Sequence, residues 1–196
     1  MTDIFTAIIL LFVVVDPVGN IPLFMAVTSR LDPSHRRRVL LASVAVASGV
    51  LALFALFGIQ FLGYFGVGIA DFMVASGTIL ATFSIYYLLK PYEYAPATEG
   101  VEVAVVPLAV PFLAGPASIS YVLVISQQMG ALTALAVIAI VSLLTLLTLL
   151  ASDYIMKALG IIGIRVIEKL MLLLSMTIGV ALIRKGVSMW LEAPTV

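Results

Sequence analysis

Residues 131–151 form an unbroken run of mostly apolar side chains that contains no charged residue. A helix that crosses a bilayer needs roughly 20 mostly apolar residues, so this run is long enough to span the hydrocarbon core. A strand of a membrane β-barrel would instead alternate apolar and polar residues over about 10 positions, and this run does not alternate. We therefore predict an all-α membrane protein.

The composition of the whole chain agrees with this prediction. Apolar residues make up 63% of the 196 positions and charged residues only 10%. An ordinary soluble domain is roughly 45–50% apolar and about 25% charged. The lipid bilayer is therefore the expected partner of most of the chain, and a water-soluble enzyme, a disordered tail and a nucleic-acid binder are excluded.

Five further apolar stretches are long enough to cross the membrane. A mildly amphipathic segment, residues 152–169, is expected to precede the last of them. The six predicted transmembrane helices cover residues 4–28, 39–62, 69–89, 103–128, 131–151 and 170–190.

The basic residues predict how these helices are oriented. If six helices alternate, eight basic residues fall on one side of the membrane and two on the other. The eight are Arg30, Arg36, Arg37, Arg38, Lys90, Lys157, Arg165 and Lys169, and the two are Arg184 and Lys185. Because Lys and Arg accumulate in cytoplasmic loops, we expect a cytoplasmic loop at Arg36–Arg38 and both termini outside the cell membrane.

The chain divides into two halves, residues 1–94 and 95–196, with three predicted helices each. In each half the first helix is interrupted by Gly and Pro, at Asp16–Pro22 and at Ala114–Ser120. Since three is an odd number, the second half enters the membrane upside down relative to the first. The fold class predicted is therefore a pair of inverted-topology repeats with broken helices 1 and 4, a pattern that marks a binding site near the midplane.

The chemistry of such breaks favours a zwitterion. Backbone groups freed from a helix cannot face lipid, so they face protein or a watery cavity. Helix N-termini at Gly19–Asn20 and Pro116–Ser118 would offer amides and a positive dipole end to a carboxylate. The carbonyls near Val15 and Leu113 would suit an ammonium group or a small cation.

Asp16 lies about twelve residues into the first helix, near the middle of the bilayer at 1.5 Å per residue. A carboxylate at that depth is costly, and its default interpretation is functional. Asp16 is expected to bind an ammonium group or carry a coupling proton, or else to cap the following half-helix, and the two roles can coexist. Asn20 and Ser118 are placed either to cap the half-helices or to touch the ligand.

Thr78 lies in the third predicted helix of the first half, and Thr177 in the third predicted helix of the second. Both are candidate walls of the binding pocket between the two breaks. Close helix packing through small residues is the alternative interpretation for such positions. The full set of predicted substrate-binding residues is Asp16, Pro17, Val18, Gly19, Asn20, Gly115, Pro116, Ala117, Ser118, Thr78 and Thr177.

Neither a catalytic site nor a metal site is expected. The sequence has no cysteine, and its one histidine, His35, sits in a predicted basic loop. An intramembrane enzyme would need a nucleophile with a base, or metal ligands, and Asp16 has no second deep carboxylate beside it. No cofactor is expected, and a coupling ion, if there is one, is a proton or sodium.

Two segments, Asp16–Phe24 and Pro107–Ile119, resemble the corresponding motifs of the MarC family of membrane proteins, which includes SnatA-type neutral amino acid transporters. The resemblance extends over essentially the whole chain, with Ala117 at a position where the family's pattern usually has Gly. It implies transport of small neutral amino acids such as glycine, alanine or serine.

The leading hypothesis is a secondary transporter that binds a small neutral amino acid at mid-membrane, between the breaks of helices 1 and 4, and works by alternating access. The alternative is an exporter or a channel for another small polar solute. A purely structural membrane protein would leave the two breaks and Asp16 unexplained. The exact amino acid, the direction of transport and the oligomeric state are not determined by the sequence.

Overall fold

The computed structural model describes residues 3–90 and 108–192, and all of their regular secondary structure is helical. The first half contains α1 (Ile4–Val15), α2 (Ile21–Val27), α3 (Pro33–Tyr64) and α4 (Ile69–Leu89). The second contains a π-helical turn η1 (Leu108–Leu113), α6 (Pro116–Met129), α7 (Ala131–Leu150) and α8 (Ser152–Glu192). The predicted boundary between residues 94 and 95 and the predicted start of a helix at residue 103 lie outside the described residues.

Four helices are long and apolar enough to cross a membrane, namely α3, α4, α7 and the part of α8 from Ile162 to Glu192. Helix α1 is apolar but shorter. The prediction of a multi-pass, all-α membrane protein is confirmed, and the first predicted helix is indeed divided, into α1 and α2.

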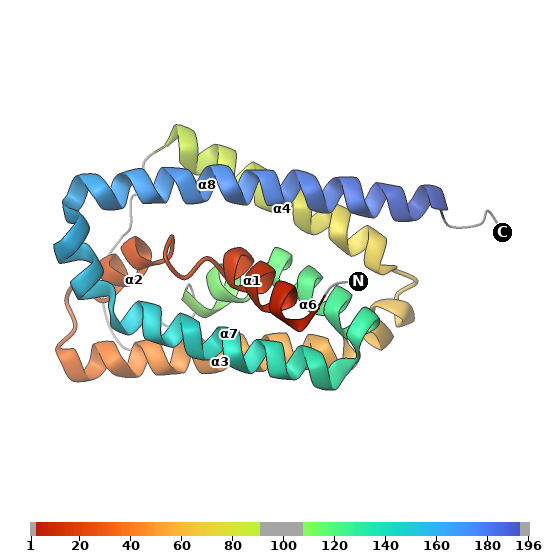
Figure 1. The fold of residues 1–196 in the computed structure, drawn as a ribbon, viewed down its shortest axis with the longest axis horizontal. Helices are drawn as coiled ribbons and strands as arrows, with labels where there is room; N and C mark the ends of the chain where they lie inside the picture. The colour runs from red at the N-terminus through yellow and green to blue at the C-terminus, as the bar shows by residue number, and fades with distance from the viewer. Residues whose placement is uncertain (1–2, 91–107, 193–196) are drawn as a thin grey trace.

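The elements lie in three layers (Figure 1). Helices α4 and α8 pack along each other on one side, and α3 and α7 pack on the other. The shorter elements α1, α2 and α6 lie between them, and α6 contacts both α3 and α4. The main apolar core joins α1, α2, η1 and α6 to α3 and α7, so the broken helices are held mainly against the α3–α7 layer.

Small residues bring α4 and α8 unusually close. A Cβ atom added at Gly77 would lie 2.4 Å from the carbonyl oxygen of Gly179. A Cβ at Gly186 would lie 2.7 Å from the carbonyl oxygen of Ala70. Backbones this close need glycine at the contact, as is common between membrane helices.

The Arg-rich segment is helical, which corrects the prediction of a loop at Arg36–Arg38. Helix α3 begins at Pro33, directly after its N-cap residue Asp32, and proline is favoured in the first helical turn. The Ser34 hydroxyl donates a hydrogen bond to Asp32, and together with the contact from His35 it holds the pKa of Asp32 at about 2. A negative charge at this end stabilises the helix.

Arg36, in the first turn of α3, contacts both α2 and α8. Its guanidinium donates to both carboxylate oxygens of Asp153, at 2.9 and 3.1 Å, and to the Ser152 hydroxyl at 3.0 Å. It also lies over the ring of Phe24, 4.9 Å from the centroid. The start of α3 is thereby tied to α2 and to the start of α8.

The segment labelled α8, Ser152–Glu192, consists of two helices that meet at a kink, so a separate segment precedes the last membrane-crossing helix as predicted, but the boundary lies at Gly160 and not at Leu170. Gly160 has φ 65° and ψ 179°. Positive φ is accessible to glycine at little cost. The membrane-crossing part therefore begins about eight residues earlier than predicted, at Ile162.

Candidate functional site

The first break is a tight turn organised by Asp16, which follows α1 in the left-handed conformation with φ 47°. Its Oδ1 atom accepts a hydrogen bond from the backbone N–H of Gly19 at 2.9 Å. A Cβ atom at Gly19 would lie only 2.2 Å from Asp16 Oδ2. Gly19 is therefore required for the carboxylate to occupy this position.

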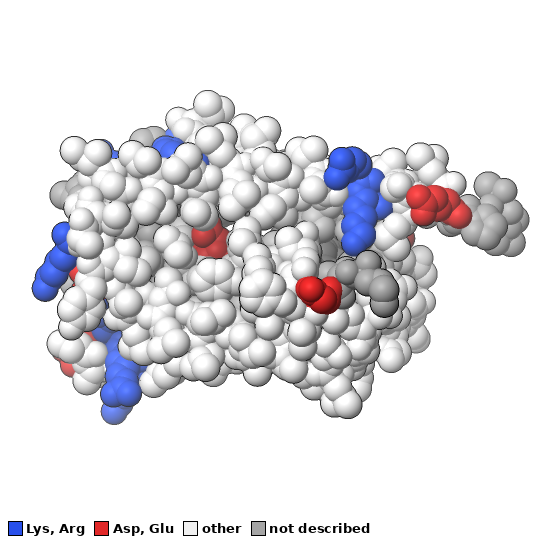
Figure 2. All heavy atoms as spheres, in the orientation of Figure 1, with Lys and Arg blue, Asp and Glu red and all other residues white. Residues whose placement is uncertain are grey.

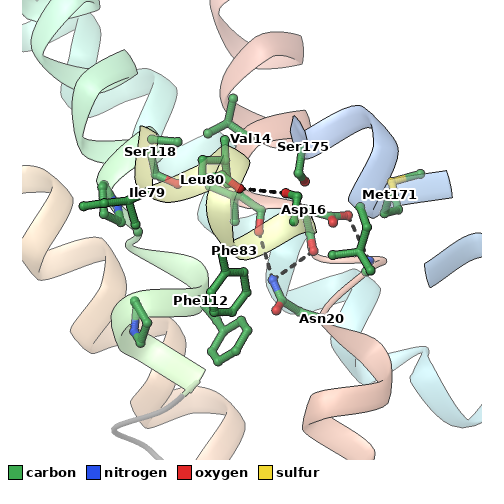
Figure 3. Close-up of a pocket in the computed structure, with 18 of the residues that line it drawn as sticks. Val14, Asp16, Asn20, Ile79, Leu80, Phe83, Phe112, Ser118, Met171 and Ser175 are labelled. Atoms are coloured by element: carbon green, nitrogen blue, oxygen red, sulfur yellow. Dashed lines mark hydrogen bonds between the residues drawn. The ribbon is translucent and has the colours of Figure 1, made fainter. Parts of the chain in front are cut away.

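Asn20 closes the turn from the other side. Its side-chain amide is buried and donates to the carbonyl oxygens of Val15 and Asp16, at 3.0 and 2.9 Å (Figure 3). Its backbone N–H donates to the Asp16 carbonyl, and the N–H of Ile21 donates to the Val18 carbonyl, both at 3.1 Å.

These bonds correct two expectations. The amides of Gly19, Asn20 and Ile21 already have acceptors within the turn, so these three N–H groups are not free to bind a carboxylate. The side chain of Asn20 does not cap α2, and its hydrogen bond occupies the Val15 carbonyl that was expected to receive an ammonium group. The group of the first break that remains available to a ligand in the cavity is the carboxylate of Asp16.

The second break has the opposite character. Gly115 is the N-cap of α6 and has extended backbone geometry, without a side-chain capping bond, and Pro116 is the first helical residue. The first amides of a helix have no carbonyl partner within it, and here these are the N–H groups of Ala117 and Ser118. The Ser118 hydroxyl is buried, with 1% of the residue exposed, and has no hydrogen-bond partner.

Both breaks line one cavity of about 160 Å³. The remaining walls come from α1, α4, η1 and α8 (Figure 3). A volume of roughly 150 Å³ holds a benzene-sized guest, so this cavity fits a solute of five to seven non-hydrogen atoms.

Seven of the eleven predicted substrate-binding residues line this cavity. They are Asp16, Gly19, Asn20, Gly115, Pro116, Ala117 and Ser118. Pro17 and Val18 belong to the first turn but do not line the cavity, and Val18 packs against the main core.

Thr78 and Thr177 are not cavity walls, which corrects the expectation for both. Each is exposed, and its hydroxyl donates to the carbonyl four residues earlier, Val74 for Thr78 and Leu173 for Thr177. The side chains that line the cavity lie two positions away on the same helices, Leu80 on α4 and Ser175 on α8.

Sequence reasoning missed several lining residues. Glu168 and Ser175 of α8 contribute polar groups, and Ser84 of α4 contributes a hydroxyl that donates to the Leu80 carbonyl at 2.8 Å. The others are apolar and include two aromatic residues in edge-to-face contact, Phe83 and Phe112, with centroids 5.6 Å apart. Glu168 carried a usable signal, because it is an acid within the first turns of a membrane-spanning helix.

The polar side chains that line the cavity can bind a solute through charge and hydrogen bonds. Among residues 3–90 and 108–192, no group of three or more His, Cys, Asp or Glu side chains is placed to hold a metal ion. The described lining residues include two carboxylates, Asp16 and Glu168, and no lysine or arginine. The cavity thus combines negative charge at one wall with a helix N-terminus and a free hydroxyl at another.

Comparison with known proteins identifies relatives that align with this chain over most of their length. Residues 1–191 match the model of a family described as MarC family integral membrane protein. The chain is 28% identical over 198 residues to the "UPF0056 inner membrane protein YhgN" of Escherichia coli K12, which covers 98% of this chain and 100% of the relative. It is 30% identical to the "UPF0056 membrane protein MJ0972" of Methanocaldococcus jannaschii, over 90% of this chain and 83% of the relative. No solved structure matches.

Proposed function

The chain belongs to the MarC family of integral membrane proteins, and from this premise we propose that it is a secondary transporter of small neutral amino acids such as glycine, alanine and serine. The observation that carries the proposal is the polarity of the cavity. Ser118 is a buried hydroxyl without a partner at the N-terminus of α6, and it lines the same cavity as the carboxylate of Asp16.

A zwitterion satisfies both ends of such a cavity. Its ammonium group would lie at Asp16, and its carboxylate would accept from the Ser118 hydroxyl and from the first amides of α6, where the helix dipole is positive. A cavity of about 160 Å³ has room for the side chain of alanine or serine against Leu80 and Phe112, and little more.

We propose that alternating access comes from the inverted repeat. Helix α3 packs with α7 and α4 packs with α8, which is the pairing expected of two repeats related by a two-fold axis in the membrane plane. The close α4–α8 pair would move as one unit against the broken helices and the α3–α7 layer. The Arg36–Arg38 end would be cytoplasmic and both termini outside.

The decisive experiment compares two buried serines of the same helix. Ser118 and Ser120 both have hydroxyls without partners, but only Ser118 lines the cavity. For reconstituted protein in vesicles, Ser118→Ala should raise the KM for labelled glycine about tenfold or more, since a lost hydrogen bond to a charged group is worth roughly 1.5–3 kcal/mol. Ser120→Ala should leave the KM unchanged.

A thermal-unfolding screen against the twenty amino acids tests the substrate class, because a ligand that binds the folded state raises its stability. Glycine, alanine and serine should raise the Tm of the wild type more than that of Ser118→Ala. A flat response to all three would contradict the proposal. Exchange of labelled glycine driven by unlabelled glycine separates a carrier from a channel, which would show none.

A further inference from the structure

A second cavity, which we name the basic cavity, lies between α4, α6 and α8 and has a volume of about 410 Å³. Its charged lining residues are Arg184 and Lys185 of α8, and Tyr121 and Ser188 contribute side chains with hydroxyl groups. The remaining lining residues are apolar: Met73, Val124, Ala181 and Leu182. None of these described lining residues is acidic.

The two cations of the basic cavity are available to a ligand. Arg184 and Lys185 are both exposed, and neither forms an ion pair within the described part of the chain. Arg36, at the other end of the molecule, is by contrast held by Asp153. Figure 2 shows Lys and Arg side chains over the C-terminal part of α8, separated by a largely uncharged band from those at the opposite end.

The basic cavity lies next to the cavity between the two breaks, which we name the central cavity, along α4, α6 and α8. On α8, Ser175 lines the central cavity, and Ala181, six residues later, lines the basic cavity, a rise of about 9 Å. On α6, Ser118 lines the central cavity and Tyr121, the next turn, lines the basic one. The two cavities therefore follow each other along the same three helices.

An apolar wall separates them. A separate cluster of buried side chains consists of Ile69, Met73, Ala117, Val124 and Leu182, with Val14, Leu80, Tyr121, Ile178 and Met189 packed against it. Ala117 and Leu80 of this cluster also line the central cavity, whereas Met73 and Leu182 also line the basic cavity. A charged solute in the basic cavity is thus kept from Asp16 by side chains that offer it almost no polar group.

We propose that the basic cavity is a second binding site, which takes a small anionic oxygen group, a carboxylate or a phosphate, between Arg184 and Lys185. On the transport path it holds the carboxylate of the amino acid before the apolar wall opens toward Ser118. That place on the path rests on the proposed function, whereas binding of the anion does not. The same chemistry is supplied by the phosphate of a membrane lipid, so the experiment distinguishes the two sources.

The first measurement is thermal unfolding of the full chain in a maltoside detergent without lipid. Sodium acetate is compared with sodium chloride at equal ionic strength, for the wild type, for the double variant Arg184→Gln/Lys185→Gln, and for Arg37→Gln/Arg38→Gln as a control with the same charge change on exposed residues. Acetate should raise the Tm of the wild type and the control above that in chloride. The double variant should lose about half or more of this increase.

An equal acetate effect in all three proteins, together with an equal effect of the lipid described next, would overturn the anion site. A parallel series adds short-chain phosphatidylglycerol. Stabilisation of the wild type and the control by this lipid, lost in the double variant and not produced by acetate, assigns the site to a lipid phosphate and overturns its place on the substrate path.

The second measurement is glycine uptake in vesicles. Arg184→Gln/Lys185→Gln should raise the KM roughly tenfold, because the carboxylate of the amino acid loses its charge-assisted hydrogen bonds in the basic cavity, with kcat within about twofold. The wild-type KM should rise with ionic strength, and that of the double variant should not. An unchanged KM overturns the role on the path. Absence of uptake by the wild type contradicts the proposed function alone, because the acetate and lipid results still decide the anion site.

Discussion

Gly19 is the residue on which the position of the Asp16 carboxylate depends. A methyl group there would meet Asp16 Oδ2 at 2.2 Å and displace it. Gly19→Ala should therefore reduce glycine uptake about tenfold or more, because the negative group would no longer lie at the cavity wall. Uptake assays in vesicles check this.

Gly49→Ala is the matched control, since a Cβ atom at Gly49 has no neighbour within 4 Å. It should transport like the wild type. Equal uptake by both variants would remove Asp16 from the proposed site.

Asn20 holds the ends of the first break together through two hydrogen bonds from its amide nitrogen. Asn20→Asp keeps the shape of the side chain but turns an oxygen acceptor toward the carbonyls of Val15 and Asp16. We expect a loss of about 1–3 kcal/mol of stability, measured as a lower Tm, together with lost uptake. Gln128→Glu, the same chemical change at an exposed position of α6, should be neutral, and similar Tm values for the two variants would contradict this role of Asn20.

At the residue scale the sequence located the breaks but not their internal hydrogen bonds. Asp16, Gly19 and Pro116 are readable because their conformational preferences are local. Which acceptor each amide uses depends on the closed geometry of the turn, so the sequence suggested free amides at Gly19 and Asn20 where the structure has satisfied ones. Thr78 was misplaced because one position on a helix turns a side chain by about 100°, from the cavity to the exposed face.

At the scale of elements, the α4–α8 pair depends on the absence of side chains at its crossing. Gly77→Ala places a methyl group 2.4 Å from the Gly179 carbonyl oxygen and should destabilise the protein by roughly 1–3 kcal/mol through overpacking. Gly63→Ala, where a Cβ meets nothing within 4 Å, is the control. A Tm for Gly77→Ala equal to that of Gly63→Ala would show that the two helices separate without cost.

Helix identities were predictable, whereas some helix limits were not. The long apolar run of α7 was predicted to end one residue from its observed end. Helix α3 starts earlier than the apolar pattern because Asp32 and Pro33 supply a start signal that hydropathy does not register. The charged segment at the start of α8, residues 152–169, is helical except at Gly160, and two of its charged side chains, Asp153 and Lys169, bind other helices. Lys169, for example, donates to the carbonyls of Tyr87 and Leu88 at the end of α4, at 2.7 and 3.3 Å.

At the scale of the whole molecule, the proposed orientation can be tested directly because the chain has no cysteine. Single-cysteine variants Arg38→Cys and Tyr64→Cys introduce a thiol at exposed positions near opposite ends of α3. In intact cells a membrane-impermeant maleimide should label Tyr64→Cys, and should label Arg38→Cys only after the membrane is opened. The reverse pattern would place the termini in the cytoplasm.

The multi-pass helical architecture could be predicted from the sequence because it follows from hydropathy, and an orientation could be proposed from the number of basic residues on each side. Layering of the helices and the existence of a second cavity could not, because both depend on which faces of α4, α6 and α8 meet. Arg184 and Lys185 illustrate the limit. In the sequence they were only the two basic residues on the predicted outer side of the membrane. That they line one cavity with Tyr121 became visible only in three dimensions.

The charges of the central cavity have an electrical consequence. Its described lining carries the carboxylates of Asp16 and Glu168 without a lysine or arginine, while the proposed cargo has no net charge. The membrane voltage, worth about 2.3 kcal/mol per elementary charge per 100 mV, therefore acts on the protein and on any cation it carries, and not on the amino acid. Uptake measured at imposed potassium diffusion potentials would report the movement of that charge, and Asp16→Asn would flatten the voltage dependence.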